Sequence, residues 1–424
     1  MSLYSPDVSN IVVMKFGGTS VADAEGIRRA ARRIVEKREA GFSVVAVLSA
    51  RGKTTDELIA MAQTLSADPD PREMDMLLSS GERISCALCA IAINALGHRA
   101  ISLTGSQAGI VTDDSHTKAR ILDVRADRVR AALDEDSIVL VAGFQGVSST
   151  AKNVTTLGRG GSDTTAVAVA AALGAEECEI YTDVAGVYTA DPRIVPDARK
   201  LETISFEEML EMAASGAGVL QLRSVEYARN HGVRIHCRSS FDDCPGTVVV
   251  SEGENMDHVE KPLITAVTHS TSEARVTLIG VPDEPGVAAS IFEALAEANV
   301  DVDMIDQNVP TSAGGLAEIS FTVSREDLRA ARAALEPLAG EAFSELIAQE
   351  EMGKVSIIGA GMRSHPGVAA RVFRVLAAEG VNIEMISTSP IKISCVIDRA
   401  LVPRAVQALH SAFELSGPGT DLPE

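Results

Sequence analysis

Residues 11–20 read IVVMKFGGTS, a run of six residues that is apolar except for its lysine, followed by two glycines. Such a run, without polar alternation, is typical of a strand that is covered on both faces. The glycines predict a tight turn, and residues 24–40 have the apolar spacing of an amphipathic helix. Together these features predict a strand–turn–helix unit of an α/β fold.

The same rhythm continues to about residue 250. Strands that alternate with helices predict an α/β/α sandwich with a mostly parallel central sheet, which we assign to residues 11–250. Residues 1–10 are expected to form a flexible extension. Further strands are expected at residues 43–48, 137–142, 179–182 and 233–237, and further helices at residues 72–96, 164–173 and 219–230.

The second part of the chain repeats itself after a polar, acidic linker at residues 251–263. VTLIG at residues 276–280 and VSIIG at residues 355–359 each precede a Pro-Gly-Val-Ala motif, a helix and a similar second strand. This similarity predicts two copies of a ferredoxin-like β-α-β-β-α-β unit. We place them at residues 264–345 and 346–424, with strands that can be exchanged between the two units.

The composition excludes several classes of function. Of the 424 residues, 46% are hydrophobic and 3% aromatic, and the formal net charge is −21. A surface this acidic repels nucleic acids and anionic membranes, and the few aromatics argue against base-stacking platforms. No apolar run reaches the ~18 residues of a membrane-spanning helix, and no basic signal sequence opens the chain. We therefore expect a cytoplasmic protein that binds neither nucleic acid nor membrane.

The cysteines and histidines indicate no metal centre. Cys86 and Cys89 have the spacing of a redox or zinc motif, but they lie in an apolar run without a second ligand pair. We interpret them as core residues of a protein from a reducing compartment. The histidines at positions 98, 116, 231, 236 and 410 show no ligand spacing and are interpreted as core or surface residues.

Lys15, Phe16, Gly17 and Gly18 form the first of two glycine-rich turns. Exposed backbone N–H groups at such a turn, ahead of a helix, favour phosphate. Lys15 precedes the glycines, unlike the lysine of a P-loop, so its ammonium can reach a phosphoryl group held above them. The alternative is an ordinary strand–helix turn whose lysine extends to solvent.

The second glycine-rich turn is TTLGRGGSDTT at residues 155–165, which runs into an apolar helix. Its glycines and hydroxyl groups suit an anion-binding nest, and Arg159 suits bidentate capture of a carboxylate. Asp163 supplies a fixed anion. Alternatively, Asp163 is only a favourable charge in the first turn of a helix.

Three other segments supply further polar candidates. Residues 49–57 form a polar loop at the carboxyl end of a strand, where open α/β sheets bind ligands. Glu82, on an otherwise apolar helix, can hold a substrate ammonium or a structural salt bridge. In residues 182–193, Tyr188 can face a nucleobase and Arg193 a phosphate.

The motifs KFGGTS at 15–20, GER at 81–83 and TLGRGGSD at 156–163 together resemble those of the aspartate kinases. The similarity continues through residues 180–193 and both repeats, which resemble ACT domains, and covers nearly all of the chain after residue 10. It is strongest to the bacterial type that lysine and threonine inhibit. The resemblance implies an amino-acid-kinase fold and transfer of the γ-phosphoryl group of MgATP to the β-carboxylate of L-aspartate, an early step of lysine, threonine and methionine biosynthesis.

The resemblance also implies roles for individual residues. Lys15 would stabilise charge on the transferred group, and Asp163 would orient the catalytic residues. Magnesium would be held mainly by phosphates and water. The implied substrate-binding residues are Thr55, Glu82, Arg159, Gly160, Gly161 and Ser162. The implied ATP-binding residues are Lys15, Phe16, Gly17, Gly18, Ser49, Ser162, Thr182, Asp183, Tyr188, Asp191 and Arg193.

ACT domains imply sensing of lysine, threonine or both, and a homo-oligomer that forms through them. Loop-to-helix starts in both repeats offer backbone N–H groups to an effector carboxylate. Asp303 and Glu384 can bind the effector ammonium, or are merely exposed acids on strand ends. The implied regulatory residues are Asp283, Pro285, Gly286, Val287, Asp303, Gln307, His365, Pro366, Gly367, Val368, Asn382 and Glu384.

Met256 bears on the assembly, because an internal start in the overlapping-gene type yields a separate regulatory chain. The codons of residues 252–254 can form a ribosome-binding sequence, so we predict a second chain from near Met256 and an α2β2 assembly. The alternative is a linker that happens to contain methionine.

Rival functions are those of glutamate 5-kinase, acetylglutamate kinase and uridylate kinase, which lack the paired ACT tail. A catalytically silent amino-acid sensor is a further rival, against which Lys15, Arg159 and Asp163 argue.

Overall fold

The computed structural model describes residues 10–252, 263–308, 316–365 and 367–417. The described chain divides into two compact units. The first unit holds residues 10–187, 200–213 and 218–252, and the second holds residues 188–199, 214–217 and 263–417. The predicted N-terminal extension to residue 9, most of the predicted linker, Met256 and Pro366 lie outside the described residues.

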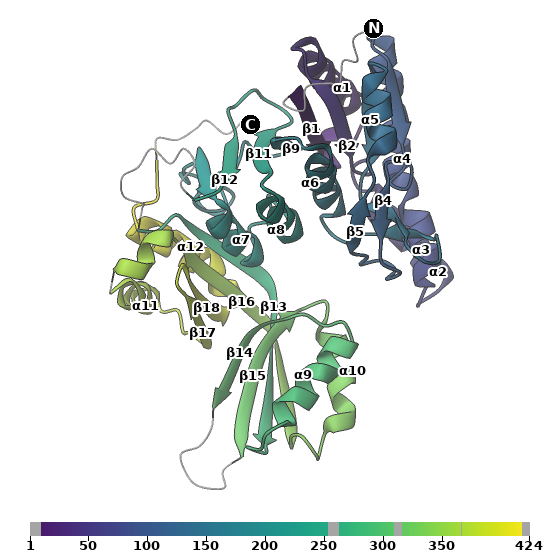
Figure 1. Cartoon of the computed structure of the whole chain (residues 1–424). Helices are drawn as coiled ribbons and strands as arrows, with labels where there is room; N and C mark the ends of the chain where they lie inside the picture. Colours follow the sequence, from purple (N-terminus) through teal and green to yellow (C-terminus); the bar gives the residue numbers. More distant parts are fainter. Residues whose placement is uncertain (1–9, 253–262, 309–315, 366, 418–424) are drawn as a thin grey trace. The chain divides into compact units, whose positions relative to one another are not determined.

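The first unit is built on an eight-stranded sheet in the order β10-β12-β11-β9-β1-β2-β6-β3 (Figure 1). From β11 to β3 all neighbours are parallel, and β12 runs antiparallel to β11. The central strands are buried almost throughout, which confirms the prediction from their continuous apolar runs. The strands are β1 (Ile11–Phe16), β2 (Ser43–Leu48), β3 (Ala100–Leu103), β6 (Ile138–Ala142), β9 (Glu177–Thr182), β10 (Thr203–Ser205), β11 (Arg234–Ser239) and β12 (Thr247–Val250).

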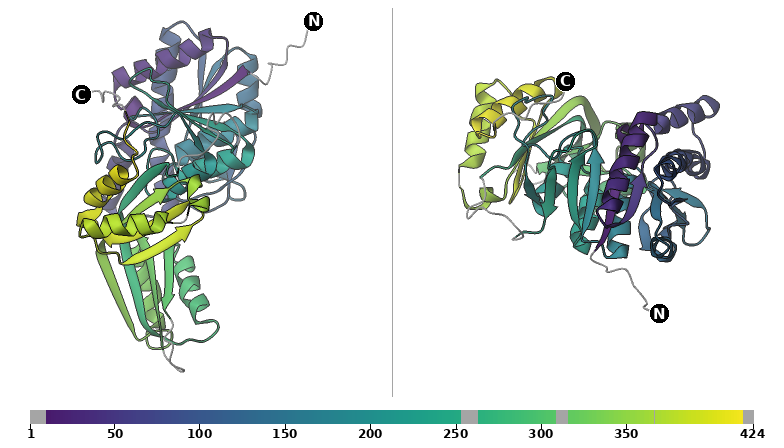
Figure 2. Two further views of the ribbon diagram at one scale, coloured as in Figure 1. Left: turned by 90° about the vertical axis from the view of Figure 1, so that its left-hand side faces the viewer. Right: turned by 90° about the horizontal axis from the view of Figure 1, so that it is seen from above.

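Helices cover both sides of this sheet (Figure 2). Apolar residues of α1 and α4 form one continuous core with those of β1, β2 and β6, and this core includes Cys86 and Cys89. Both thiols are free, and burial raises the pKa of Cys89 to about 12, in keeping with a packing role. The helices are α1 (Ala24–Glu39), α2 (Thr54–Leu65), α3 (Pro71–Leu78), α4 (Ser80–Ala95), α5 (Asp127–Asp134), α6 (Gly161–Leu173), α7 (Phe206–Ala214) and α8 (Leu222–His231).

The single helix predicted at residues 72–96 is wrong, because α3 and α4 meet at Ser79. The hydroxyl groups of Ser79 and Ser80 donate to the carbonyls of Met76 and Leu77, and such bonds compete with the regular helix pattern. By length and composition, residues 71–95 could cross a membrane, but half of that stretch is buried inside the protein, as in a core helix. Helix α2 was not predicted.

A small second sheet, also not predicted, stands beside the main one. Its order is β5-β4-β7-β8, and its strands have only three or four residues, too few for a clear alternation. Strand β8 leads directly into the second glycine-rich turn. The strands are β4 (Ile110–Thr112), β5 (Ile121–Val124), β7 (Gln145–Ser148) and β8 (Val154–Thr156).

The second unit has one six-stranded antiparallel sheet in the order β14-β15-β13-β16-β18-β17. Strands β13 and β16 are long and pair with each other, so that each runs through both repeats (Figure 1). The strands are β13 (Ala266–Val281), β14 (Val302–Asn308), β15 (Ala317–Ser324), β16 (Glu345–Ile358), β17 (Met385–Ser389) and β18 (Lys392–Asp398). The helices are α9 (Val287–Glu297), α10 (Leu328–Leu335), α11 (Val368–Ala378) and α12 (Val402–Ala412).

Each repeat has its own hydrophobic core. One core gathers residues of α9, α10 and β15 with the second half of β13. The other gathers residues of α11, α12 and β18 with Val267 at the start of β13. This second core also contains Ala190, Val195 and Ala198, so the segment 188–199 is packed into the second unit although the sequence places it in the first domain.

Candidate active site

Four turns meet at the carboxyl edge of the main sheet, because β9, β1, β2 and β6 are parallel neighbours. Each of the last three begins with a hydrogen bond to the adjacent strand end. Gly17 N donates to Tyr181 O at 3.2 Å, Ser49 N to Phe16 O at 3.1 Å, and Gly143 N to Leu48 O at 3.1 Å. The chain proceeds from β1 to β2 on one side and returns as β9 on the other, which is the switch point where open α/β sheets bind ligands.

Lys15 and Asp163 join the two glycine-rich turns. The Lys15 ammonium forms an ion pair with the Asp163 carboxylate, and their side chains are only 11% and 8% exposed. Lys15 lies near the end of β1, while Asp163 lies in the first turn of α6, directly after the second glycine-rich turn. The structure therefore places the cation of one turn against the anion of the other.

The first glycine-rich turn packs tightly against the loop after β2. Gly52 N donates to Gly18 O at 2.9 Å, and a Cβ atom added to Gly18 would lie 2.8 Å from Ala50 O. Glycine is therefore required at position 18, since a larger residue would separate the two loops. A Cβ atom added to Gly17 would have the Lys15 ammonium as its nearest neighbour, at 3.6 Å, so the turn lies directly beside the cation.

The turn after β6 contacts the second glycine-rich turn, and it was not predicted from the sequence. Gly143 and Phe144 follow β6, and a Cβ atom on Gly143 would lie 2.8 Å from the Ser162 side chain. Phe144 O accepts from Leu157 N, and its ring lies against Gly161. The sequence did offer one signal for this turn, a glycine directly after a buried strand. Gly17 and Ser49 also lie directly after such strands.

Glu82 is a buried carboxylate with one oxygen left over. Its Oε1 accepts from Ala50 N at 3.0 Å, while Oε2 is buried and has no hydrogen-bond partner among the residues that the structure describes. Burial raises the pKa of Glu82 to about 7. The neighbouring Arg83 donates to Gln145 and Ser79 and not to Glu82, so a salt bridge with Arg83 does not explain why Glu82 is buried. The free oxygen suits a hydrogen-bonding cation such as a substrate ammonium.

The remaining candidates of the first unit lie around this edge. Ser162 is buried at the start of α6, Gly160 has φ +69° as the cap of that helix, and Arg159 is exposed one residue earlier. Thr55 is half-buried in the first turn of α2. Thr182 ends β9 and Asp183 follows it beside the first turn, where the Thr182 hydroxyl donates to Asp183 Oδ1 at 3.1 Å.

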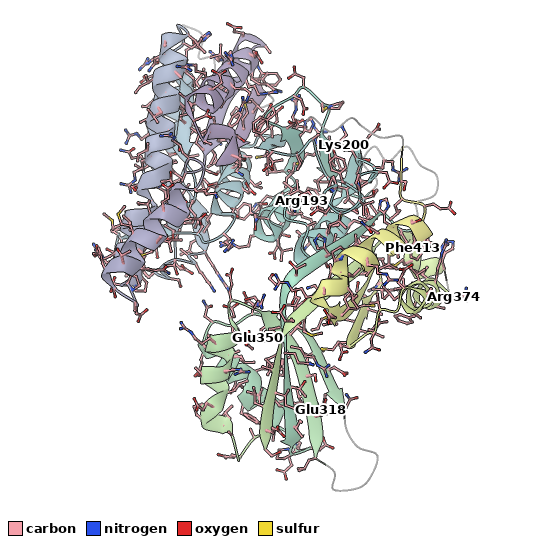
Figure 3. The ribbon with its side chains drawn as sticks, turned by 180° about the vertical axis from the view of Figure 1, so that it is seen from behind. Arg193, Lys200, Glu318, Glu350, Arg374 and Phe413 are labelled. Atoms are coloured by element: carbon pink, nitrogen blue, oxygen red, sulfur yellow. The ribbon has the colours of Figure 1, made fainter. Side chains whose placement is uncertain are left out.

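Three predicted nucleotide ligands belong to the second unit. Tyr188 packs against its second core, and Asp191 and Arg193 form an ion pair of 2.7 Å, with Arg193 at the surface (Figure 3). Both ends of the segment 188–199 return to the first unit, where Leu201 N donates to Val187 O at 2.8 Å. The structure therefore places these three residues in the second unit.

Glu177, Glu179 and His236 form the one group of possible metal ligands within the described parts of the chain. Glu179, however, already binds Lys37 at 2.7 Å, Arg238 at 3.2 Å and the Tyr181 hydroxyl at 2.9 Å. Two cations compensate this buried carboxylate, so the group is better explained as an ion-pair cluster.

The two predicted effector acids have partners within the second unit. Asp303 forms an ion pair with buried Lys354, which also binds Glu273 at 3.3 Å, and Glu384 binds Arg275 at 3.1 Å. Lys354 and Arg275 occupy equivalent positions of the two repeats, so each repeat's cation binds the other repeat's acid. An effector ammonium would have to compete with these cations.

The predicted effector loops have the same geometry in both repeats. Gly286 and Gly367 cap α9 and α11 with φ of +104° and +105°, which only glycine adopts freely. Val287 and Val368 begin these helices. Of the other predicted regulatory residues that the structure describes, all lie in the same unit: Asp283, Pro285, Gln307, His365 and Asn382.

Comparison with known proteins fits this geometry. Residues 10–239 match the model of the amino acid kinase family, and residues 275–340 and 355–413 each match an ACT domain model. The aspartokinase of Mycolicibacterium smegmatis is 58% identical over 96% of this chain and 97% of its own length. The chain belongs to the aspartokinases. The aspartokinase of Corynebacterium glutamicum is 53% identical over the same shares.

Solved aspartokinase structures share the fold. E. coli aspartokinase III in complex with aspartate and ADP has a TM-score of 0.82 at 28% identity, covering 95% of this chain and 99% of that one. The same enzyme with lysine and aspartate has a TM-score of 0.71 at 28% identity, covering 96% and 100%. This aspartokinase is therefore an ATP-dependent kinase with ACT domains that imply allosteric regulation, as the sequence predicted.

Proposed function

We propose that this aspartokinase transfers the γ-phosphoryl group of MgATP to the β-carboxylate of L-aspartate and gives 4-phospho-L-aspartate. The ion pair of Lys15 with Asp163, between two glycine-rich turns, supports this proposal most strongly. Donor and acceptor are both anions, so the enzyme must mainly position them and compensate their charge. The acceptor carboxylate is already ionised at neutral pH, so no strong base is needed.

Each turn has a role in this proposal. Phe16, Gly17, Gly18 and Ser49 would lie along the phosphates, and the ammonium of Lys15 compensates the charge on the transferred group. Asp163 holds that ammonium in place until the phosphoryl group arrives. The close packing at Gly18 fixes this turn against the loop after β2.

The amino-acid substrate is recognised at both of its charged ends. Arg159 binds the α-carboxylate through two parallel hydrogen bonds, with the backbone of Gly160, Gly161 and Ser162 beside it. Glu82 binds the ammonium with its free Oε2. Thr55 contributes a hydroxyl group. A dicarboxylic amino acid satisfies both sites and still presents its second carboxylate to the donor.

Nucleotide and metal complete the proposal. Thr182, Asp183, Tyr188, Asp191 and Arg193 would frame the nucleotide, as the sequence predicts. Mg²⁺ would be held mainly by phosphate oxygens and water and would neutralise charge that develops on them.

The first prediction concerns Lys15. Lys15→Met should lower the rate of MgATP-dependent aspartyl hydroxamate formation by at least about 10³-fold, because the charge on the transferred group loses its cation. The control is Lys152→Met, which removes an exposed lysine of the same unit. The structure also predicts some loss of stability, since Asp163 is left buried and without its lysine partner. Lys15→Met/Asp163→Asn separates the two effects, and hydroxamate formation at the wild-type rate in folded Lys15→Met refutes the proposal.

We further propose that lysine and threonine inhibit the enzyme through the second unit, which assembles as a homo-oligomer. The glycine-capped starts of α9 and α11 support this, because they offer N–H groups to an effector carboxylate. An effector changes activity only by binding one state of the enzyme more tightly than another. Hydroxamate assays with saturating lysine, threonine and both should show inhibition, and an unchanged rate in all three contradicts this part.

Internal initiation near Met256, which would give α2β2, is tested by native expression and mass analysis of the products.

A further inference from the structure

Asp75 is a buried carboxylate whose position the proposed mechanism does not use. It lies on α3, is fully buried, and accepts hydrogen bonds from Thr156 Oγ1 at 2.5 Å, Thr117 N at 3.1 Å and His116 Nδ1 at 2.5 Å. No lysine or arginine is among these partners. These three hydrogen bonds compensate the burial of the carboxylate, and their donors come from two separate segments.

One of the donors leads directly to the substrate-binding turn. Thr156 ends β8, and Arg159 follows three residues later. The other two donors, His116 and Thr117, belong to the loop before β5, and that loop bonds the same strand end because Ala119 N donates to Thr156 O at 2.9 Å. Asp75 therefore binds both segments that meet just before Arg159.

Arg223 of α8 and Gln221, which caps that helix, also contact this turn. Arg223 donates to Leu157 O at 2.8 Å and to Ala119 O at 3.1 Å, so it grips the same two segments. The Gln221 side chain lies where a Cβ atom on Gly160 would be, with its Cγ 2.0 Å from that position. The turn is thus fixed at Thr156, Leu157 and Gly160, while Arg159 projects from it with an exposed side chain.

We propose that Asp75 is a positioning residue for the amino-acid substrate. By holding Thr156, its carboxylate fixes the backbone from which Arg159 reaches the substrate α-carboxylate. Asp75 acts through Thr156 and touches no substrate. A bidentate guanidinium–carboxylate contact depends on orientation, so a loosened turn should weaken binding of aspartate more than binding of ATP. The inference rests on the proposed role of Arg159.

Thr156 offers a matched pair of variants. Thr156→Val keeps the volume and removes the hydroxyl group, while Thr156→Ser keeps the hydroxyl group. We expect Thr156→Val to raise KM for aspartate at least fivefold, with KM for ATP within twofold of wild type, and Thr156→Ser to restore both values. A merely structural role would lower Tm in Thr156→Val without this split between the two substrates. Unchanged KM for aspartate in folded Thr156→Val overturns the inference.

A double-mutant cycle with Arg159→Ala separates this inference from the proposed function. If Asp75 acts through Arg159, Thr156→Val should change KM for aspartate less than twofold in the Arg159→Ala background. If Arg159→Ala alone leaves KM for aspartate unchanged, the proposed role of Arg159 fails. If Arg159→Ala raises KM but the effect of Thr156→Val is fully additive, only the role of Asp75 fails. Should Thr156→Val not fold, His116→Ala with His116→Asn as its control repeats the cycle from the second donor, with the same outcomes.

Discussion

At the scale of single residues, Glu82 combines a stability cost with a binding role. A carboxyl group whose pKa rises from 4.5 to about 7 on folding is destabilising above pH 4.5, because the unfolded chain ionises first. This loss grows as the pH rises through the range between the two pKa values and reaches at most about 3 kcal/mol above pH 7. Such a residue is retained where its charge is needed.

Glu82→Gln should therefore make the enzyme more stable and less active. The amide oxygen can still accept from Ala50 N, while the buried charge is removed. We expect a higher Tm at pH 8 and a KM for aspartate that is raised at least tenfold. In the wild type, KM for aspartate should also rise as the pH falls below about 7, because Glu82 becomes protonated, and this part of the pH profile should be absent from Glu82→Gln. A lower Tm at pH 8 with unchanged KM would mean that Glu82 serves the fold instead.

Much at this scale could be predicted from the sequence, and the rest depends on distance in space. Lys15 and Asp163 were predicted because each lies in a glycine-rich motif, which is a local feature. Asp75 could not be predicted, since its three partners lie 41, 42 and 81 positions away. Nothing in the neighbourhood of Asp75 in the sequence distinguishes it from an exposed acid of a short helix.

At the scale of elements, the glycines before α6 are constrained by packing as well as by backbone geometry. Gly160 has φ +69° and faces the Gln221 side chain, whereas Gly232 has φ +68° and nothing within 4 Å of an added Cβ atom. At both positions a side chain would cost about 1 kcal/mol, because the backbone is in the left-handed region. Only at position 160 would the added side chain also clash with a neighbour.

Gly160→Ala should therefore impair the enzyme more than Gly232→Ala. We expect both variants to lose about 1 kcal/mol of stability from backbone strain. Only Gly160→Ala should lower kcat/KM for aspartate, by at least tenfold, because Gln221 or the turn must move. Thermal unfolding and hydroxamate kinetics measure the two effects, and Gln221→Ala should partly rescue Gly160→Ala. Equal kinetics of the two glycine variants would contradict this assignment.

The strand–helix order of the first unit could also be predicted at this scale, because its central strands are continuous apolar runs. The β4, β5, β7 and β8 sheet was missed since its strands are only three or four residues long. The break at Ser79 was missed because the apolar pattern continues through it. Periodicity predicts which residues are covered, and it does not show where a side chain replaces a backbone hydrogen bond.

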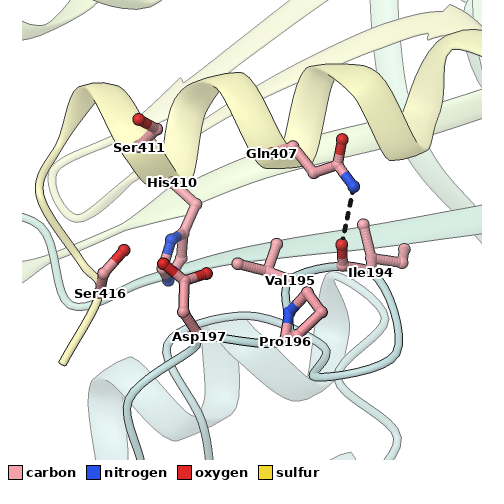
Figure 4. A pocket seen from close by; sticks show the side chains of 8 residues that line it. All are labelled: Ile194, Val195, Pro196, Asp197, Gln407, His410, Ser411 and Ser416. Carbon is pink, nitrogen blue, oxygen red and sulfur yellow. Dashed lines mark hydrogen bonds between the residues drawn. The ribbon is translucent and has the colours of Figure 1, made fainter. Parts of the chain in front are cut away.

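At the scale of the whole molecule, His410 links the segment 188–199 to helix α12 of the second unit. The Thr189 hydroxyl donates to Leu415 O at 3.2 Å and therefore accepts from His410 Nε2 at 2.9 Å. Beside them, Asp197, Ser411 and Ser416 line a cavity of about 220 Å³ between this segment and α12 (Figure 4). Burial lowers the pKa of His410, so the folded protein resists the proton that the unfolded chain takes up.

Stability of the second unit should therefore decrease in acid. A histidine with a lowered pKa contributes its full stability above the unfolded value of 6.5, and this is lost as the pH falls below it. His269, whose pKa is also lowered by burial, acts in the same direction. We expect Tm of the second unit's transition to fall between about pH 7.5 and pH 5.5, and the decrease to be smaller in His410→Gln, whose amide can still donate to Thr189. An equal pH dependence in both proteins would exclude His410 as a cause.

The packing of Ala190, Val195 and Ala198 into the second repeat has a consequence for any shorter polypeptide translated from Met256. Such a product would carry all strands of the second unit's six-stranded sheet and the helices that cover it, yet it would lack the twelve-residue segment 188–199, which helps to fill one of its cores. Its apolar gap would need filling by other means. The short product expressed alone should therefore be cut by protease faster than the same region of the full-length chain, whose own insert fills that core.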